Sequence, residues 1–106
     1  MPKFLFHGSY TAAGAAGLLK DGGSGRLTAI EALATSLGGS IESCYWALGK
    51  DDFYIVAELQ DNKAAAALSL TVGSTGAVTI STAELFSAAD VDEIAARRAT
   101  YRAPGA

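Results

Sequence analysis

Hydrophobic residues in this chain recur at two different spacings, and the order of those spacings constrains the fold more than any other feature. Every second residue lies on one apolar face in four stretches, which predicts β-strands at 3–10, 40–48, 52–59 and 77–85. Capping residues and helical spacing predict helices at 12–20, 24–37 and 62–72. The order strand, helix, strand, strand, helix, strand predicts an antiparallel four-stranded sheet with its helices on one face.

A further helix is predicted after the last strand. Ser87 and Asp90 have the spacing of a capping box, and Phe86 and Val91 have that of a hydrophobic staple. Acidic residues come early and arginines late, which suits the helix dipole and predicts a helix that continues to Pro104. The fold class predicted is therefore α+β, a ferredoxin-like βαββαβ arrangement with an added C-terminal helix.

Size and charge exclude several classes of protein. A chain of 106 residues that is 50% hydrophobic fits one domain over residues 1–106 and is unlike a disordered scaffold. Its net charge of −3 argues against binding to nucleic acid. Residues 64–83 carry no charge, but their serines, threonines and glycines predict a helix end, a turn and a strand rather than a membrane span. Cys44 is the single cysteine, which favours the reducing cytoplasm.

Helices on one face of the sheet leave its other face uncovered. Strand 52–59 carries Phe53, Ile55 and Ala57 on one face and Tyr54 and Val56 on the other, so aromatic and aliphatic side chains stand on the uncovered face whichever face that is. An uncovered sheet face with aliphatic and aromatic side chains is a surface for association. We therefore expect a homodimer, or a higher homo-oligomer, in which two sheets pack face to face.

The chain resembles the GYD-domain family of small bacterial proteins over most of its length. The resemblance rests on the segments FLFHGSYT at 4–11, GLLKDGGS at 17–24 and GKDDFY at 49–54. In the hairpin turn that carries the family signature, Gly49 is followed by Asp51 at the tyrosine position and Asp52 at the aspartate position. The resemblance implies membership of the dimeric α/β-barrel group, which includes cofactor-free monooxygenases, haem-handling proteins and non-catalytic regulators.

Four side chains are candidates for a ligand pocket: His7, Tyr10, Trp46 and Tyr54. Aromatic residues on neighbouring strands also pack in cores and interfaces, so a structural role is the alternative for each. His7 is the only histidine, and it could act as a general base, a haem ligand or a packed side chain. We predict no metal site and no cofactor, because no cluster of histidine, cysteine and carboxylate residues stands at a metal-binding spacing.

Two functions remain from the sequence. The first is a non-catalytic homo-oligomeric domain that has a structural role or binds a small apolar or aromatic ligand. The second is a cofactor-independent oxygenase or isomerase acting on a small aromatic metabolite, with His7 as base, Tyr10 or Tyr54 orienting a substrate hydroxyl and Trp46 lining the pocket. The exposure and neighbours of His7 distinguish the two.

Overall fold

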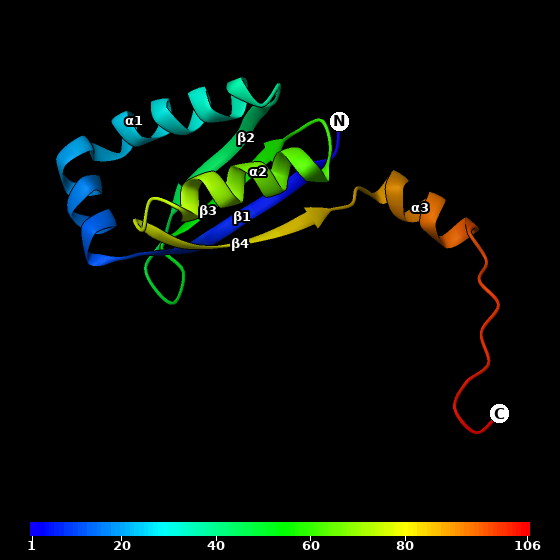
Figure 1. The fold of residues 1–106 in the computed structure, drawn as a ribbon. Helices are drawn as coiled ribbons and strands as arrows, with labels where there is room; N and C mark the ends of the chain where they lie inside the picture. The colour runs from blue at the N-terminus through cyan, green and yellow to red at the C-terminus, as the bar shows by residue number, and fades with distance from the viewer.

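The computed structural model describes residues 1–106 and contains a mixed fold with one antiparallel sheet (Figure 1). The strands are β1 (Lys3–Tyr10), β2 (Ser40–Trp46), β3 (Phe53–Glu58) and β4 (Val78–Leu85), in the spatial order β2-β3-β1-β4. The helices are α1 (Ala12–Ser36), α2 (Asn62–Gly73) and α3 (Ala88–Ala96). This order and topology are consistent with the ferredoxin-like plan expected from the sequence.

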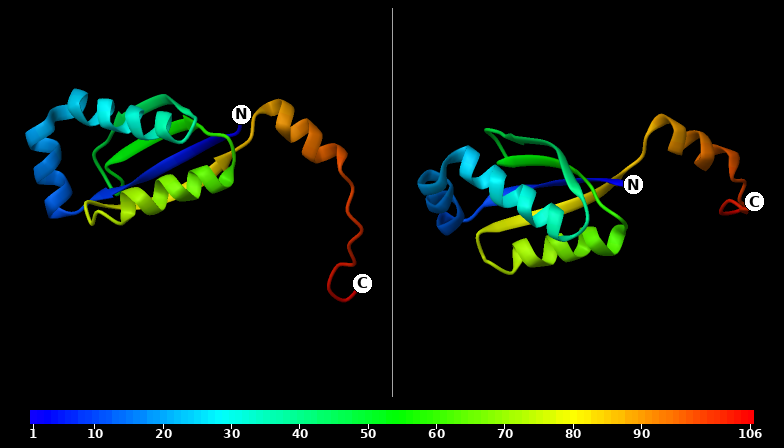
Figure 2. Two further views of the ribbon diagram at one scale, coloured as in Figure 1. Left: turned by 45° about the horizontal axis from the view of Figure 1, so that its top comes forward. Right: turned by 90° about the horizontal axis from the view of Figure 1, so that it is seen from above.

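Helices α1 and α2 both cover one face of the sheet, which we call the covered face (Figures 1 and 2). The side chains that the strands turn toward these helices form the buried core with Leu59, Ala65 and Leu68, and they are Phe4, Phe6, Phe53, Ile55 and Ala57. The alternate residues of the same strands stay partly or largely exposed on the opposite face, the open face. No helix of this chain lies over the open face (Figure 2).

Helix α1 consists of two helical segments that meet at a kink. Gly22 interrupts the helical geometry with φ 72° and ψ 171°, a left-handed φ that glycine adopts without steric cost. The Thr11 side chain caps the helix by accepting a hydrogen bond from the Gly14 amide. Gly14 itself packs against the carbonyl of Ala77, where a Cβ atom would overlap the backbone. The break predicted between the two helices is thus a bend that lets α1 follow the sheet.

The uncharged stretch 64–83 folds as the sequence predicted. It comprises most of α2, a turn at 74–77 and the first six residues of β4. The Asp61 side chain caps α2 by accepting a hydrogen bond from the Ala64 amide. None of the helices combines the length and the apolar character that a bilayer span needs.

The ends of the elements differ from the prediction, most of all in α3. β1 has the predicted ends, and β4 begins one residue later than predicted. β2 and β3 are each two residues shorter, mainly because 47–52 form the hairpin loop between them. The capping box of Ser87 and Asp90 is present, but α3 ends at Ala96 and Arg97 is extended. The predicted continuation of the helix to Pro104 is wrong. A short helix with no buried residue gains little from packing, so its last turns do not form.

Candidate functional site

Tyr10 and Trp46 meet on the covered face, at the end of the sheet where β1 and β2 finish. The Trp46 indole Nε1 donates a hydrogen bond of 2.9 Å to the Tyr10 hydroxyl. The Tyr10 ring packs on Phe53 with the ring centroids 5.5 Å apart. This pair extends the core, and its one polar contact satisfies the indole N–H, which would otherwise lose a partner on burial.

A small cavity of about 270 Å³ borders Tyr10 between α1, α2 and β4. Gly14 and Gly17 form part of its wall on α1, and Val72 and Val78 form part of the opposite wall. The polar groups that line it include Asp21, just before the kink in α1, and Arg26, just after it. Their charged groups lie 3.8 Å apart and form an ion pair. The cavity is therefore a mainly apolar space with an ion pair at its edge.

His7 lies on the open face and belongs to a polar cluster. Its Nδ1 is 2.8 Å from Oδ2 of Asp51, and the two side chains are 30% and 23% exposed. Because a carboxylate accepts hydrogen bonds, His7 donates to Asp51 through Nδ1, and the neutral imidazole with this tautomer has its lone pair on Nε2. Tyr54, directly across on β3, stacks on the imidazole with an interplanar angle of 11° and a centroid distance of 6.1 Å. The three side chains form the His7 cluster.

The hairpin loop 47–52 positions this cluster. Asp52 accepts a hydrogen bond of 2.9 Å from the Tyr10 amide, and its own amide donates to the Gly8 carbonyl. These bonds fold the loop back along the end of β1, and Asp51 then reaches His7. Gly49, with φ 138°, provides the backbone conformation that few other residues adopt. The turn residues predicted from the sequence thus act through different contacts, Asp52 on the backbone and Asp51 on the imidazole.

The four predicted pocket residues do not gather in one pocket of this chain. Tyr10 and Trp46 lie on the covered face, whereas His7 and Tyr54 lie on the open face. His7 lies on the face opposite the helices, and it lines neither the cavity of about 270 Å³ nor that of about 980 Å³. The contact between His7 and Asp51, 44 residues apart, was missed by sequence reasoning. No signal in the sequence could have found this contact, because it depends on the register that pairs Phe53 with Gly8 and so brings the preceding loop residues close to His7.

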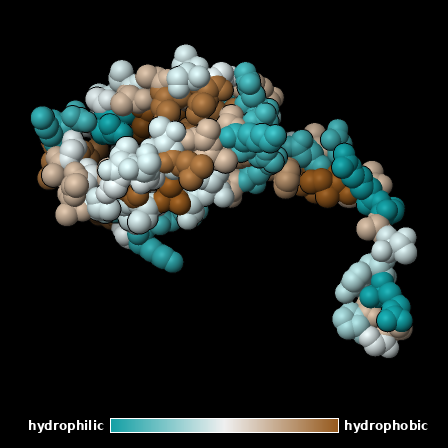
Figure 3. Space-filling view, viewed as in Figure 1, coloured by the Kyte–Doolittle hydropathy of each residue, from teal (hydrophilic) through white to brown (hydrophobic).

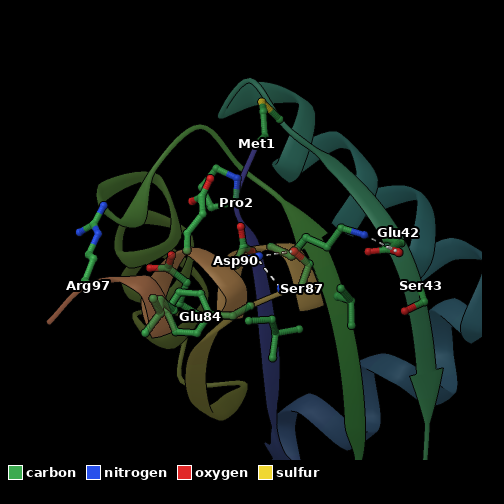
Figure 4. A pocket seen from close by; sticks show the side chains of 14 residues that line it. Met1, Pro2, Glu42, Ser43, Glu84, Ser87, Asp90 and Arg97 are labelled. Atoms are coloured by element: carbon green, nitrogen blue, oxygen red, sulfur yellow. Dashed lines mark hydrogen bonds and ion pairs between the residues drawn. The ribbon is translucent and has the colours of Figure 1, made fainter.

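Charged residues and a second cavity occupy the other end of the open face. Lys3 forms an ion pair of 3.0 Å with Glu42 and lies 3.9 Å from Glu58. The hydrogen bond to Glu42 raises the pKa of Lys3. Beside it, a cavity of about 980 Å³ lies between the strand ends and α3 (Figure 4). Histidine, cysteine and carboxylate side chains nowhere form the group of three or more that could hold a metal ion.

Cys44 lies on β2 opposite Ile55 and packs against the core of the covered face. Burial raises the pKa of its thiol, and the negative charge of Glu31 raises it further. A thiol in this setting is a weak nucleophile at neutral pH, because little of it is ionised.

Comparison with known proteins adds a single positive finding. The sequence model of the family described as the GYD domain matches residues 4–95. Neither a curated protein nor a solved structure matches the chain.

Proposed function

This chain belongs to the GYD domain family, and from that premise we propose that it is a non-catalytic homodimeric module that binds a small apolar or aromatic ligand. A fold supports many activities, so the proposal rests on the geometry of the chain. The free thiol of Cys44 is in keeping with a place in the cytoplasm, which we include in the proposal.

The observation that carries the ligand-binding proposal is the cavity between α1, α2 and β4. Its volume of about 270 Å³ suits a ligand with one aromatic ring. Apolar side chains would bury the ring, and polar groups at the border would orient it. The Tyr10 hydroxyl already accepts from Trp46, so its own O–H remains able to donate to a ligand oxygen.

The open face supports the homodimer. It combines apolar side chains such as Leu5 and Val56 with the aromatic rings of Tyr45 and Tyr54, of which Tyr45 is 70% exposed. Aromatic residues are enriched where proteins associate. Packing two open faces together would produce a closed, barrel-like assembly of two sheets and would cover the His7 cluster.

Binding can be tested with phenol and toluene as one-ring probes. We expect amide resonances of Gly14, Gly17 and Val78 to shift during titration, with a dissociation constant on the order of 1 mM, about −4 kcal/mol. Gly17→Leu should abolish these shifts, because the new side chain fills the cavity, and Ala16→Leu on the exposed side of α1 is the matched control. Equal binding by wild type and Gly17→Leu would overturn the proposed site.

A second candidate function is cofactor-independent isomerase or oxygenase activity on a small aromatic metabolite. The observation that favours it is the His7 cluster, in which Asp51 orients the imidazole and leaves Nε2 as an available base. Tyr54 is the side chain placed to orient a substrate hydroxyl, because Tyr10 and Trp46 lie on the other face.

This activity has a direct assay in proton exchange. Phenylpyruvate in deuterated buffer would exchange its C3 protons faster with the protein than without it, as followed by NMR. His7→Ala should reduce the protein-dependent rate by at least about 100-fold, as expected for loss of a general base. A His7→Ala protein that is as active as wild type would exclude this role.

A further inference from the structure

Helix α3 lies outside the body of the chain and exposes an apolar side. Phe86, Val91 and Ile94 are 58%, 51% and 48% exposed, and no residue of α3 is buried. Figure 1 shows the helix projecting beyond the end of β4, and Figure 3 shows hydrophobic side chains on it. A nine-residue helix without packing is marginal in water, so the stability of α3 requires a surface to pack on.

The dimensions of the chain indicate how much surface remains to be covered. Its radius of gyration is 16.9 Å, compared with about 13 Å for a compact chain of this length. Its accessible surface is 7126 Å², compared with about 5,500 Å² for a folded monomer of this mass. The excess of about 1,600 Å² per chain comes from the open face, from α3 and from the exposed, extended residues 97–106 (Figure 1). For two chains the excess is about 3,200 Å², which is enough to include an interface of the size that obligate homodimers bury.

The cavity of about 980 Å³ connects the two unpartnered surfaces. Ser43 and Val56 line it from the open face, and Asp90, Ile94 and Arg97 line it from α3. Figure 4 shows Glu42 and Ser43 on β2 at one side of this space, Arg97 at the opposite side, and Ser87 and Asp90 between them. A body placed on the open face would therefore also touch the inner side of α3.

We propose that α3 is an arm, meaning a helix that packs against a second copy of this chain and holds it in the dimer. When two copies pack open face to open face, the α3 of each lies along the flank of the other and buries Phe86, Val91 and Ile94 there. A two-fold arrangement covers both exposed surfaces of both chains in one association. The proposal rests on the homodimer proposed above, and it adds the element that holds the two copies together.

The test compares dimer dissociation constants, measured by analytical ultracentrifugation, for two matched variants. Ile94→Asn places an amide on the apolar side of α3 and is expected to weaken the dimer at least tenfold. Asp92→Asn places the same side chain on the other side of the helix, away from the cavity, and should change the constant less than twofold. Because α3 contributes nothing to the buried core, both variants should keep the wild-type far-ultraviolet circular dichroism of the body.

The outcomes separate the arm from the dimer. A wild-type chain that stays monomeric at all concentrations would overturn both proposals. If the wild type is a dimer and Ile94→Asn leaves it intact, or if both variants weaken it equally, the proposed role of α3 is wrong while the proposed dimer stands.

Hydrogen exchange provides an independent measurement on the unmodified chain. The amides of Ala88–Ala96 should be protected only at concentrations at which the dimer forms. Protection that persists in the monomer would mean that α3 folds onto its own sheet, and absence of protection in the dimer would mean that it packs on nothing. Either result contradicts the arm.

Discussion

The two faces of the sheet are built from the same four strands, yet they differ in what their side chains do. On the covered face, alternate residues such as Phe6 and Ile55 are buried beneath α1 and α2, and the polar pair of Tyr10 and Trp46 is satisfied internally. On the open face, the intervening residues carry the His7 cluster and the ion pairs of Lys3. The difference teaches that one face holds the fold together, while the other keeps polar and aromatic side chains that the fold itself does not bury.

The sharpest contrast is expected between neighbouring residues of β1. Phe6 is 1% exposed, so Phe6→Ala should lower the free energy of unfolding by about 3–5 kcal/mol. Leu5→Ala on the open face should cost about 1 kcal/mol, because the side chain is only partly buried. Urea denaturation of dilute protein measures both. A Leu5→Ala loss that grows with protein concentration would indicate that a second copy covers the open face.

Two glycines of α1 provide the next largest contrast. Gly14→Ala should destabilise the chain by about 2 kcal/mol, because the new methyl group overlaps the Ala77 carbonyl. Gly17→Ala meets no atom and should stabilise α1 by about 0.5–1 kcal/mol. Thermal unfolding followed by circular dichroism distinguishes them. Equal effects would mean that the start of α1 does not pack closely on β4.

Removing a tyrosine hydroxyl from each face tests the polar contacts. Tyr10→Phe deprives the Trp46 indole of its acceptor and should cost about 1 kcal/mol. Tyr54→Phe keeps the stacking on His7 and should leave the free energy of unfolding within about 0.5 kcal/mol of wild type. Chemical denaturation measures the free energy of unfolding of both variants. A larger loss for Tyr54→Phe than for Tyr10→Phe would mean that the open face, and not the covered face, contains the structural hydrogen bond.

The smallest expected effect is a difference in thiol reactivity. Because burial raises the pKa of Cys44, less thiolate is present at pH 7–8 and reaction with a disulfide reagent should be several-fold slower than for an exposed thiol. Ser36→Cys in a Cys44→Ser background is the matched thiol, exposed at the end of α1 and away from the open face. The Cys44 rate should keep rising at alkaline pH after the control has levelled off. Identical pH profiles would contradict the burial of Cys44.

Local signals in the sequence were sufficient for the elements and their faces. The caps at Thr11, Asp61 and Ser87 all accept the expected amides, since a cap and its helix are close neighbours along the chain. The hairpin and the bend at Gly22 were predictable for the same reason. The far end of α3 was not, because whether a helix continues past a few turns depends on what it packs against.

The sequence by itself determined which side chains share a face, because residues in a strand alternate with a period of two. This period puts Phe6 and Tyr10 on the face opposite His7, and the predicted pocket was wrong to combine Tyr10 with His7 because it took residues from both faces. Only the tertiary structure decided that Asp51 reaches His7 and that α3 leaves the body. Both depend on contacts between segments far apart in the chain, whose geometry is set by the packing of the whole sheet.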